Sequence, residues 1–346
     1  MSAPAALRLF DGKTATDGEF SAWADLVGAE RRESWPDDPP VSADRVRRLL
    51  QNRPDFEESR CWVLDADQGA GFAAYLTIAR WHMDTNIHIA GFDLYVRPER
   101  RRQGIGEALL RLGAATAAEW ERTLLFTGSS SRIPAGETFL RRIGARIGNV
   151  TDVNQLDVTT LPPNLLREWQ ESGARRAPGY RLEWHIGPYP EALIPEMVRA
   201  KEAVNLMPHG DLELEDIHFT EAHLRQMEQV LAARGDHRWC LLLRAPGEEI
   251  AGYTELFSHP ERPGILNQGD TAVFPQHQNR GLGRWLKAAM LERALRERPE
   301  GRFVRTGNAT SNAPMLKINR EMGFRLVLSH SSWQVARASV ETYLQA

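Results

Sequence analysis

The spacing of apolar residues predicts one order of elements in the first half of the chain. Residues 17–53 have the spacing of amphipathic helices, and residues 61–78 hold two apolar strands joined by a Gly-containing turn. A third strand ends at Val96, and a Gly-rich turn, a helix, a short strand and a second helix follow as far as Gly144. Because strands and helices alternate in this way, the pattern predicts an α/β fold with a mixed sheet.

The second half of the chain repeats this order at a constant distance. Val273 lies 177 residues after Val96, and Gly281 lies 177 residues after Gly104. Such self-similarity indicates a duplication. The length of 346 residues agrees with it, because a single hydrophobic core usually stops growing at about 250–300 residues.

The duplication predicts two domains. We place them at residues 1–158 and 182–346. Residues 159–181 are rich in Pro, Gly and charged residues, and this composition is typical of a linker.

Composition and charge exclude several classes of function. The formal net charge of −3 lacks the basic excess expected of a nucleic-acid-binding protein. Cys61 and Cys240 are too few for a disulfide framework or a cysteine metal site, and we expect both in the core. Neither a secretory leader nor an apolar run of membrane-spanning length is present, so we expect a cytoplasmic protein with no membrane partner and no metal.

The Gly-rich turns carry the clearest chemical signal. They read Arg101-x-x-Gly104-x-Gly106 and Gln278-x-x-Gly281-x-Gly283, each between a strand and a helix. The first N–H groups of a helix lack internal partners and lie at the positive end of its dipole, so such a turn suits a pyrophosphate. One copy would be a weak signal, but two copies at one spacing are not easily explained by chance. Neither copy is a Walker A loop or a dinucleotide fingerprint.

Three strings in the sequence resemble the GNAT acetyltransferase superfamily. They are VxPxxRxxGIGxALL, TAVxPxHQNRGLGxxLK and NATSNAPMLKINREMGF, and the resemblance covers nearly the whole chain. It implies two tandem GNAT-like domains, each with a seven-stranded, mixed and mostly antiparallel sheet flanked by helices. It also implies that the cofactor is acetyl-CoA or another acyl-CoA, whose pantetheine arm lies where the sheet splays beside the third strand.

The same resemblance implies which residues bind the cofactor. In the first copy they are Leu94, Tyr95, Val96, Arg101, Arg102, Gln103, Gly104, Ile105 and Gly106. In the second copy they are Thr271, Ala272, Val273, Gln278, Asn279, Arg280, Gly281, Leu282, Gly283 and Arg284. We add Asn312, which matches a family Asn that often contacts the cofactor, and Asn319.

Transfer of an acyl group to an amine requires a base, because an ammonium ion has no lone pair. Glu255, on the second of the paired strands, is our first choice, although a surface carboxylate is an equally good interpretation. Asp270, before the third strand, is second. Thr77 stands at the Glu255 position of the first copy, so we expect the second copy to be catalytic. The opposite assignment stays open, since the first copy has the more regular turn.

Many GNAT enzymes supply a Tyr as general acid, four residues before the late glycine. Leu140 and Asn319 stand at these positions in the two copies. This departure puts in doubt either the acid role or the activity of a copy, although a thiolate can leave without full protonation.

Acidic loops suggest the nature of the acceptor. Asp211 and Glu213 lie before the paired strands of the second copy, and residues 34–44 hold a similar loop in the first. Such loops would form an anionic rim for a cationic amine, but helix capping and a solvated face explain them at least as well.

We therefore predict an N-acyltransferase that moves an acetyl group from acetyl-CoA to a primary amine of a small molecule or peptide by direct attack. The alternative is a non-catalytic acyl-CoA-binding or regulatory protein with one or both sites degenerate. Either a monomer or a homodimer is compatible with the sequence.

Overall fold

The computed structural model describes residues 7–66 and 71–346 in two compact units. Unit 1 comprises the chain up to residue 150 together with 209–216 and 330–346, and unit 2 comprises 151–208 and 217–329. The Gly-containing turn predicted in the first copy lies partly outside the described residues. None of the described helices has the length and apolar character needed to span a membrane.

Unit 1 is built on a sheet in the order β1-β2-β3-β4-β5-β12. The strands are β1 (Leu7–Phe10), β2 (Glu57–Asp65), β3 (Phe72–Trp81), β4 (Ile89–Val96), β5 (Leu124–Ser130) and β12 (Arg325–Ala336), which contributes residues 330–336. β4 and β5 pair in parallel and the other pairs are antiparallel, so the sheet is mixed, as predicted.

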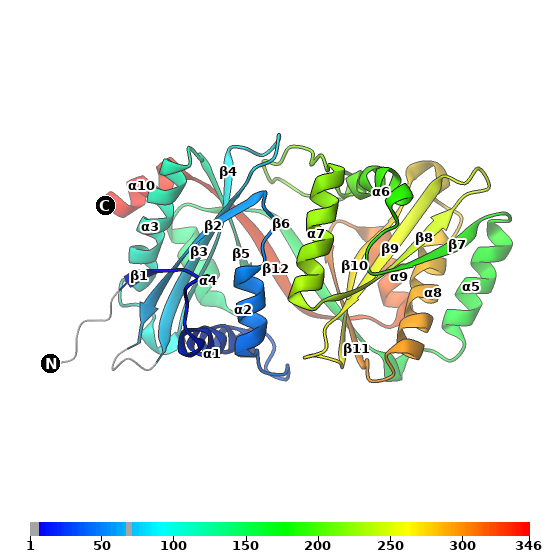
Figure 1. Ribbon diagram of the computed structural model, residues 1–346, viewed down its shortest axis with the longest axis horizontal. Coiled ribbons are helices and arrows are strands. Elements are labelled where there is room, and N and C mark those ends of the chain that lie inside the picture. Colours follow the sequence, from blue (N-terminus) through cyan, green and yellow to red (C-terminus); the bar gives the residue numbers. More distant parts are fainter. Residues whose placement is uncertain (1–6, 67–70) are drawn as a thin grey trace. The chain divides into compact units, whose positions relative to one another are not determined.

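Helices cover both faces of the unit 1 sheet (Figure 1). The helices on one face are α1 (Asp17–Ser34) and α2 (Ala43–Gln51), and those on the other are α3 (Ile105–Glu119), α4 (Pro134–Arg142) and α10 (Arg337–Gln345). Strand residues alternate between these faces: Tyr75 packs in the core beside α1, whereas Leu76 packs in the core beside α3. The Thr16–Glu19 capping box fixes the start of α1.

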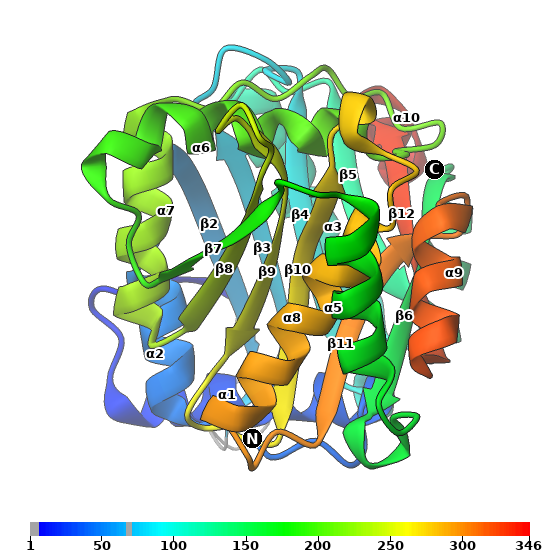
Figure 2. The ribbon, with the colours of Figure 1, turned by 90° about the vertical axis from the view of Figure 1, so that its right-hand side faces the viewer.

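Unit 2 has the same design, with strand order β6-β11-β10-β9-β8-β7. Its strands are β6 (Arg146–Asp157), which contributes residues 151–157, β7 (Arg181–Ile186), β8 (His237–Arg244), β9 (Ile250–Ser258), β10 (Ile265–Val273) and β11 (Phe303–Ala309). α6 (Ile194–Lys201) and α7 (Glu221–Arg234) pack on one face, and α5 (Leu165–Arg176), α8 (Leu282–Glu297) and α9 (Ala313–Met322) on the other. Figure 2 shows α5 alongside α8.

The units do not coincide with the two copies in the sequence. The second part of β12 pairs with β5 in unit 1, and the second part of β6 pairs with β11 in unit 2, so the last strand of each copy completes the other copy's unit. With these shares each unit draws on seven of the described strands, as the resemblance implied. The predicted boundaries at 158 and 182 therefore differ from those of the structure.

The predicted linker is also structured. Residues 159–181 contain α5, and Gly173 of this helix lies so close to Trp285 of α8 that a Cβ would come within 2.6 Å of the Trp285 side chain. The segment therefore belongs to the core of unit 2 and does not act as a spacer.

Both sheets open beside the third strand of each copy. β4 pairs with β5 only from Ile89 to Gly91, and β10 pairs with β11 only from Ile265 to Asn267. Beyond these residues the neighbouring strands separate, which confirms the splay that the resemblance implied.

Candidate active site

The Gly-rich turn of unit 1 borders a cavity of about 450 Å³. After β4, the 3₁₀ helix η2 (Pro98–Arg100) leads to Gly104, the N-cap residue of α3, whose φ is 78°. This left-handed conformation favours glycine, and a Cβ built on Gly104 would meet nothing within 4 Å. The predicted acyl-CoA residues that line the cavity are Leu94, Tyr95, Val96, Arg101, Arg102, Gly104, Ile105 and Gly106, while Gln103 is not among the lining residues.

The shape and chemistry of this cavity fit an acyl-CoA. Phe92, Ile133 and Phe139 give it apolar walls suited to a pantetheine arm. The residues Gly104, Ile105 and Gly106 at the start of α3, where the first N–H groups of a helix attract a pyrophosphate, also line it. A Cβ on Gly106 would lie 3.5 Å from Phe139, so a larger residue would narrow the passage between α3 and α4.

The first residue of each turn motif has an internal role. The Arg101 side chain donates to the carbonyl of Val96 at 2.9 Å and also pairs with Glu33. The Gln278 side chain donates to the corresponding carbonyl, that of Val273, at 3.0 Å. These side chains therefore fasten the turn to the end of the strand and are not free to bind phosphate.

On the α1 face of unit 1, two carboxylates share one tyrosine hydroxyl. Tyr75 on β3 lies 2.8 Å from Glu30 of α1 and 3.1 Å from Asp93 of β4, so its hydroxyl can donate to one or the other. Within the described part of the chain, neither carboxylate forms an ion pair. The site therefore concentrates negative charge beside β4.

This arrangement raises the affinity of the carboxylates for a proton. Burial and the neighbouring charge of Asp93 raise the pKa of Glu30 to about 7, although the Tyr75 hydroxyl acts in the opposite direction. Removal of water from around its carboxyl group likewise raises the pKa of Asp93, although the residue as a whole is exposed. A carboxylate that titrates near neutral pH is well matched to the work of a general base.

Tyr95 packs beside Tyr75 and also lines the cavity. Its hydroxyl donates to Glu33 at 2.8 Å, its ring lies 6.2 Å from that of Tyr75, and it lines the cavity. Asp93 itself lies between Phe92 and Leu94, which both line the cavity from the other face of β4. Neither Asp93 nor Glu30 was predicted from the sequence. The 177-residue spacing of Asp93 and Asp270 was a usable signal, whereas nothing in the sequence places Glu30 beside them.

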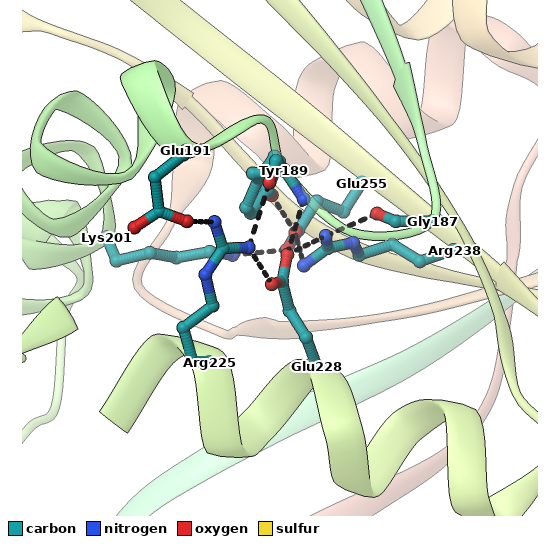
Figure 3. Close-up of polar contacts among 8 residues, drawn as sticks. All are labelled: Gly187, Tyr189, Glu191, Lys201, Arg225, Glu228, Arg238 and Glu255. Carbon is teal, nitrogen blue, oxygen red and sulfur yellow. Dashed lines mark hydrogen bonds and ion pairs between the residues drawn. The ribbon is translucent and has the colours of Figure 1, made fainter. Parts of the chain in front are cut away.

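Glu255 has a very different environment (Figure 3). It is 3% exposed, forms an ion pair with Lys201 and accepts a hydrogen bond of 3.0 Å from the Tyr189 hydroxyl. Burial disfavours its charge, but Lys201 and then Arg238, at 3.9 Å, outweigh burial and hold the pKa of Glu255 below its usual value. A buried, ion-paired carboxylate of low pKa does not suit the general base predicted at this position.

Asp270, the second choice, lies next to the same ion pair. Its carboxylate accepts a hydrogen bond of 3.3 Å from Tyr253 and lies 3.6 Å from the Lys201 ammonium. Unlike Glu255, it is about one-third exposed. The structure thus brings the two predicted catalytic residues together, but around a lysine of the chain itself.

The Gly-rich turn of unit 2 is crowded by α5. Gly281, with a φ of 79°, is the N-cap residue of α8, and a Cβ there would lie 3.2 Å from the Arg176 side chain. Arg176 also donates to the carbonyl of Asn279 at 3.1 Å. Of the predicted cofactor residues here, Arg280 stacks on Tyr180 and Arg284 pairs with Glu321. Leu282 is buried and Thr271, Ala272 and Val273 pair with β9, while Gly283 lies beside Ile318.

The two predicted asparagines are engaged inside unit 2. Asn312 caps α9 by accepting the N–H of Met315 at 3.3 Å. Asn319 is 1% exposed. Its side chain accepts a hydrogen bond of 2.7 Å from Lys287 and donates one of 2.7 Å to Asn308. Its amide therefore faces the protein interior instead of the cofactor position that we expected.

Asp211 and Glu213 do not belong to unit 2, where the anionic rim was expected. Residues 209–216 are part of unit 1, where Glu213 pairs with Arg146 and the carbonyl of Asp211 accepts from Gln334 at 3.0 Å. This placement removes the reason for assigning them to the acceptor site of the second copy. The loop was misplaced because position along the chain does not reveal which unit a loop packs against.

Cys61 and Cys240 are buried and unpaired, and burial raises the pKa of both thiols, as expected of core residues. Among the described residues, no group of three or more His, Cys, Asp or Glu side chains is placed to hold a metal ion.

Two family models match the chain. A model of the acetyltransferase (GNAT) domain matches residues 57–144, and a model of the acetyltransferase (GNAT) family matches residues 209–324. Together these stretches cover more than half of the sequence. Among curated proteins, no match is found.

Solved structures resemble the whole chain. A tandem GNAT protein from the clavulanic acid biosynthesis pathway is 23% identical with a TM-score of 0.76, and the match covers 96% of this chain and 98% of that one. A GCN5-related N-acetyltransferase from Sphaerobacter thermophilus is 16% identical with a TM-score of 0.69, and the match covers 96% and 95%. At these identities the likeness concerns the fold.

The splayed sheets, the paired Gly-rich turns and both family matches lead to one conclusion: this chain belongs to the GNAT acetyltransferase family, and it contains two GNAT domains in tandem.

Proposed function

We propose that the protein is an acyl-CoA-dependent N-acyltransferase, that unit 1 carries the reaction, and that acetyl-CoA donates its acetyl group to a primary amine of a small molecule or peptide. The observation that carries this proposal is the cavity at the unit 1 turn, which lies across β4 from the carboxylates of Glu30 and Asp93. The first copy, and not the second, then holds the catalytic base.

Different residues of unit 1 bind the parts of the acyl-CoA and the acceptor amine. The N–H groups at the start of α3 hold the pyrophosphate, and Phe92, Ile133 and Phe139 enclose the pantetheine arm. The bound acyl-CoA supplies the thioester. On the opposite face of β4, the negative charge of Glu30 and Asp93 attracts an ammonium ion and holds it near the splay.

The carboxylate pair then prepares the amine for attack. Glu30, with a pKa of about 7, takes the proton of the ammonium group and leaves a lone pair on nitrogen. The Tyr75 hydroxyl can donate a hydrogen bond to whichever of the two carboxylates is ionised, because it lies within hydrogen-bonding distance of both Glu30 and Asp93. The amine attacks the thioester carbon directly and the carbon–sulfur bond breaks. The leaving thiolate takes up the second proton that the nitrogen releases as the amide forms, so the products are the amide and the free thiol.

The second candidate function is a non-catalytic acyl-CoA-binding protein. It is favoured by the absence of a tyrosine at the general-acid position, where unit 1 has the buried Leu140 and unit 2 the buried Asn319. The two functions differ in whether thiol is released when an amine is added.

The test is an assay of thiol release from acetyl-CoA with a panel of primary amines, with mass spectrometry of the acylated product. We expect release with at least one cationic amine, a loss of about 10²–10⁴-fold in Glu30→Gln, as for removal of a general base, and no change in Asp25→Asn, an exposed position on the same helix. Binding of acetyl-CoA without release for any amine would favour the second function, and full activity of Glu30→Gln would contradict the assignment of the base.

A further inference from the structure

Each unit contains a tyrosine that donates a hydrogen bond to an aspartate, but the third group beside this pair differs between the units. In unit 1, Tyr75 donates to Asp93 at 3.1 Å, and the third group is the carboxylate of Glu30. In unit 2, Tyr253 donates to Asp270 at 3.3 Å, and the third group is the ammonium of Lys201. Within the described residues of unit 1, the two carboxylates have no cationic partner. In unit 2 the aspartate already has one, the ammonium group of Lys201.

Lys201 has the contacts that a bound amine would have. Its ammonium pairs with Glu255, lies 3.6 Å from Asp270 and lies 4.9 Å from the centre of the Tyr253 ring. Its side chain is only 10% exposed. Two carboxylates and an aromatic face are a typical setting for recognition of an ammonium ion.

The surrounding charges hold Lys201 in place. Glu255 also accepts from Tyr189 and lies 3.9 Å from Arg238, which in turn pairs with Glu228 at 2.8 Å (Figure 3). Glu255 and Asp270 together raise the pKa of Lys201 despite its burial, so it stays charged at neutral pH. A charged lysine has no lone pair and does not itself act as an acyl acceptor.

We propose that Lys201 is a built-in occupant of the acceptor position of unit 2, which excludes external amines from this unit, and that Glu255 and Asp270 bind a small primary ammonium ion when Lys201 is shortened. This inference rests on the proposed function, because that function defines where the acceptor amine binds. Its test is a binding measurement, which can succeed or fail independently of acyl transfer by unit 1.

The experiment exploits the shape of the lysine side chain. Lys201→Ala removes the three methylene carbons beyond Cβ and the ammonium group, which together have the shape of n-propylammonium. The variant leaves Glu255 buried without its main cation, so we expect its melting temperature to fall. n-Propylammonium chloride should restore the melting temperature in a saturable way, and n-propanol with sodium chloride at the same ionic strength should not.

Two controls define the site. The wild-type protein should show no saturable response to n-propylammonium, and neither should Lys201→Met, in which a side chain of similar length fills the space without charge. An equal response in all three proteins, or none in Lys201→Ala, would overturn the proposal.

A second measurement on the wild-type protein covers the case in which Lys201→Ala does not fold. The chain has only four lysines, so modification by an amine-reactive reagent can be mapped to each by mass spectrometry. We expect exposed Lys13 and Lys317 to react rapidly and Lys201 to be protected until the protein unfolds. Reaction of Lys201 at the rate of Lys317 would contradict its role as a fixed occupant.

Discussion

Two substitutions should move the pKa of the proposed base in opposite directions. Asp93→Asn removes the negative charge that raises the pKa of Glu30, so this pKa should fall. Tyr75→Phe removes the hydroxyl that hydrogen-bonds to Glu30 and lowers its pKa, so the pKa should rise. Glu33 and Arg31, the other charged neighbours that affect Glu30, are unchanged in both variants.

The size of the effect follows from the pKa of about 7 in the wild type. At pH 6 roughly a tenth of the Glu30 side chains are then ionised, and a fall of about one pKa unit, within the range of a close like charge, raises this to about half. Relative to its own plateau, kcat/KM of Asp93→Asn at pH 6 should therefore exceed that of the wild type by about fivefold. A comparable rise of the pKa in Tyr75→Phe should reduce the relative value at pH 7 by about fivefold.

The assay is kcat/KM for one amine from pH 5 to pH 9 in the three proteins. The amine titrates identically in each, so differences between the acidic limbs report the enzyme. Normalising each profile to its own plateau separates the pKa from any loss of rate that either substitution causes. Acidic limbs that coincide in all three proteins, or that shift in the same direction in both variants, would refute Glu30 as the titrating base.

Two further predictions concern the stability of unit 2. Glu255→Gln leaves Lys201 without its closest counter-ion and should lower the free energy of unfolding, measured by urea denaturation, by about 3–5 kcal/mol. Its kcat/KM should stay unchanged, and a large loss of rate in the folded variant would show that Glu255 takes part in catalysis. Burial of Lys287 lowers its pKa from 10.5 to about 7. Between about pH 7 and pH 10.5 the unfolded chain therefore binds more protons than the folded protein, and the stability of the wild type should rise with pH over this range. The melting temperature of Lys287→Met relative to wild type should therefore fall between pH 7 and pH 9.5, and a pH-independent difference, like that expected of exposed Lys317→Met, would contradict the buried titration.

The sequence predicted the elements well because each depends on local pattern. The turns at Gly104 and Gly281 have the positive φ that explains their glycines, and β11 (Phe303–Ala309) is the short strand predicted after the helix that follows the turn. The strands at Val96 and Val273 end where they were expected. These features follow from residue type, spacing and the limits of backbone conformation.

The arrangement of the elements was less predictable. Alternating apolar residues show which faces of β6 and β12 are buried, but not which sheet they join, so the exchange of terminal strands between the copies was missed. Glu30 reaches Tyr75 only through the packing of α1 on the sheet, and Lys201 reaches Glu255 only through that of α6. The ion pair that argues against Glu255 as base was not foreseen for this reason, since Lys201 is 54 residues away in the sequence.

The most direct test of the central claim is calorimetric titration of acetyl-CoA into the wild type and two variants of one residue. Gly104→Glu places a carboxylate where the pyrophosphate should lie, and Gly104→Ala imposes the same conformational strain without the charge. If unit 1 binds acyl-CoA at its Gly-rich turn, Gly104→Glu should lose a site that Gly104→Ala retains. Equal binding of acetyl-CoA by Gly104→Glu and Gly104→Ala, with the stoichiometry of the wild type, would contradict it.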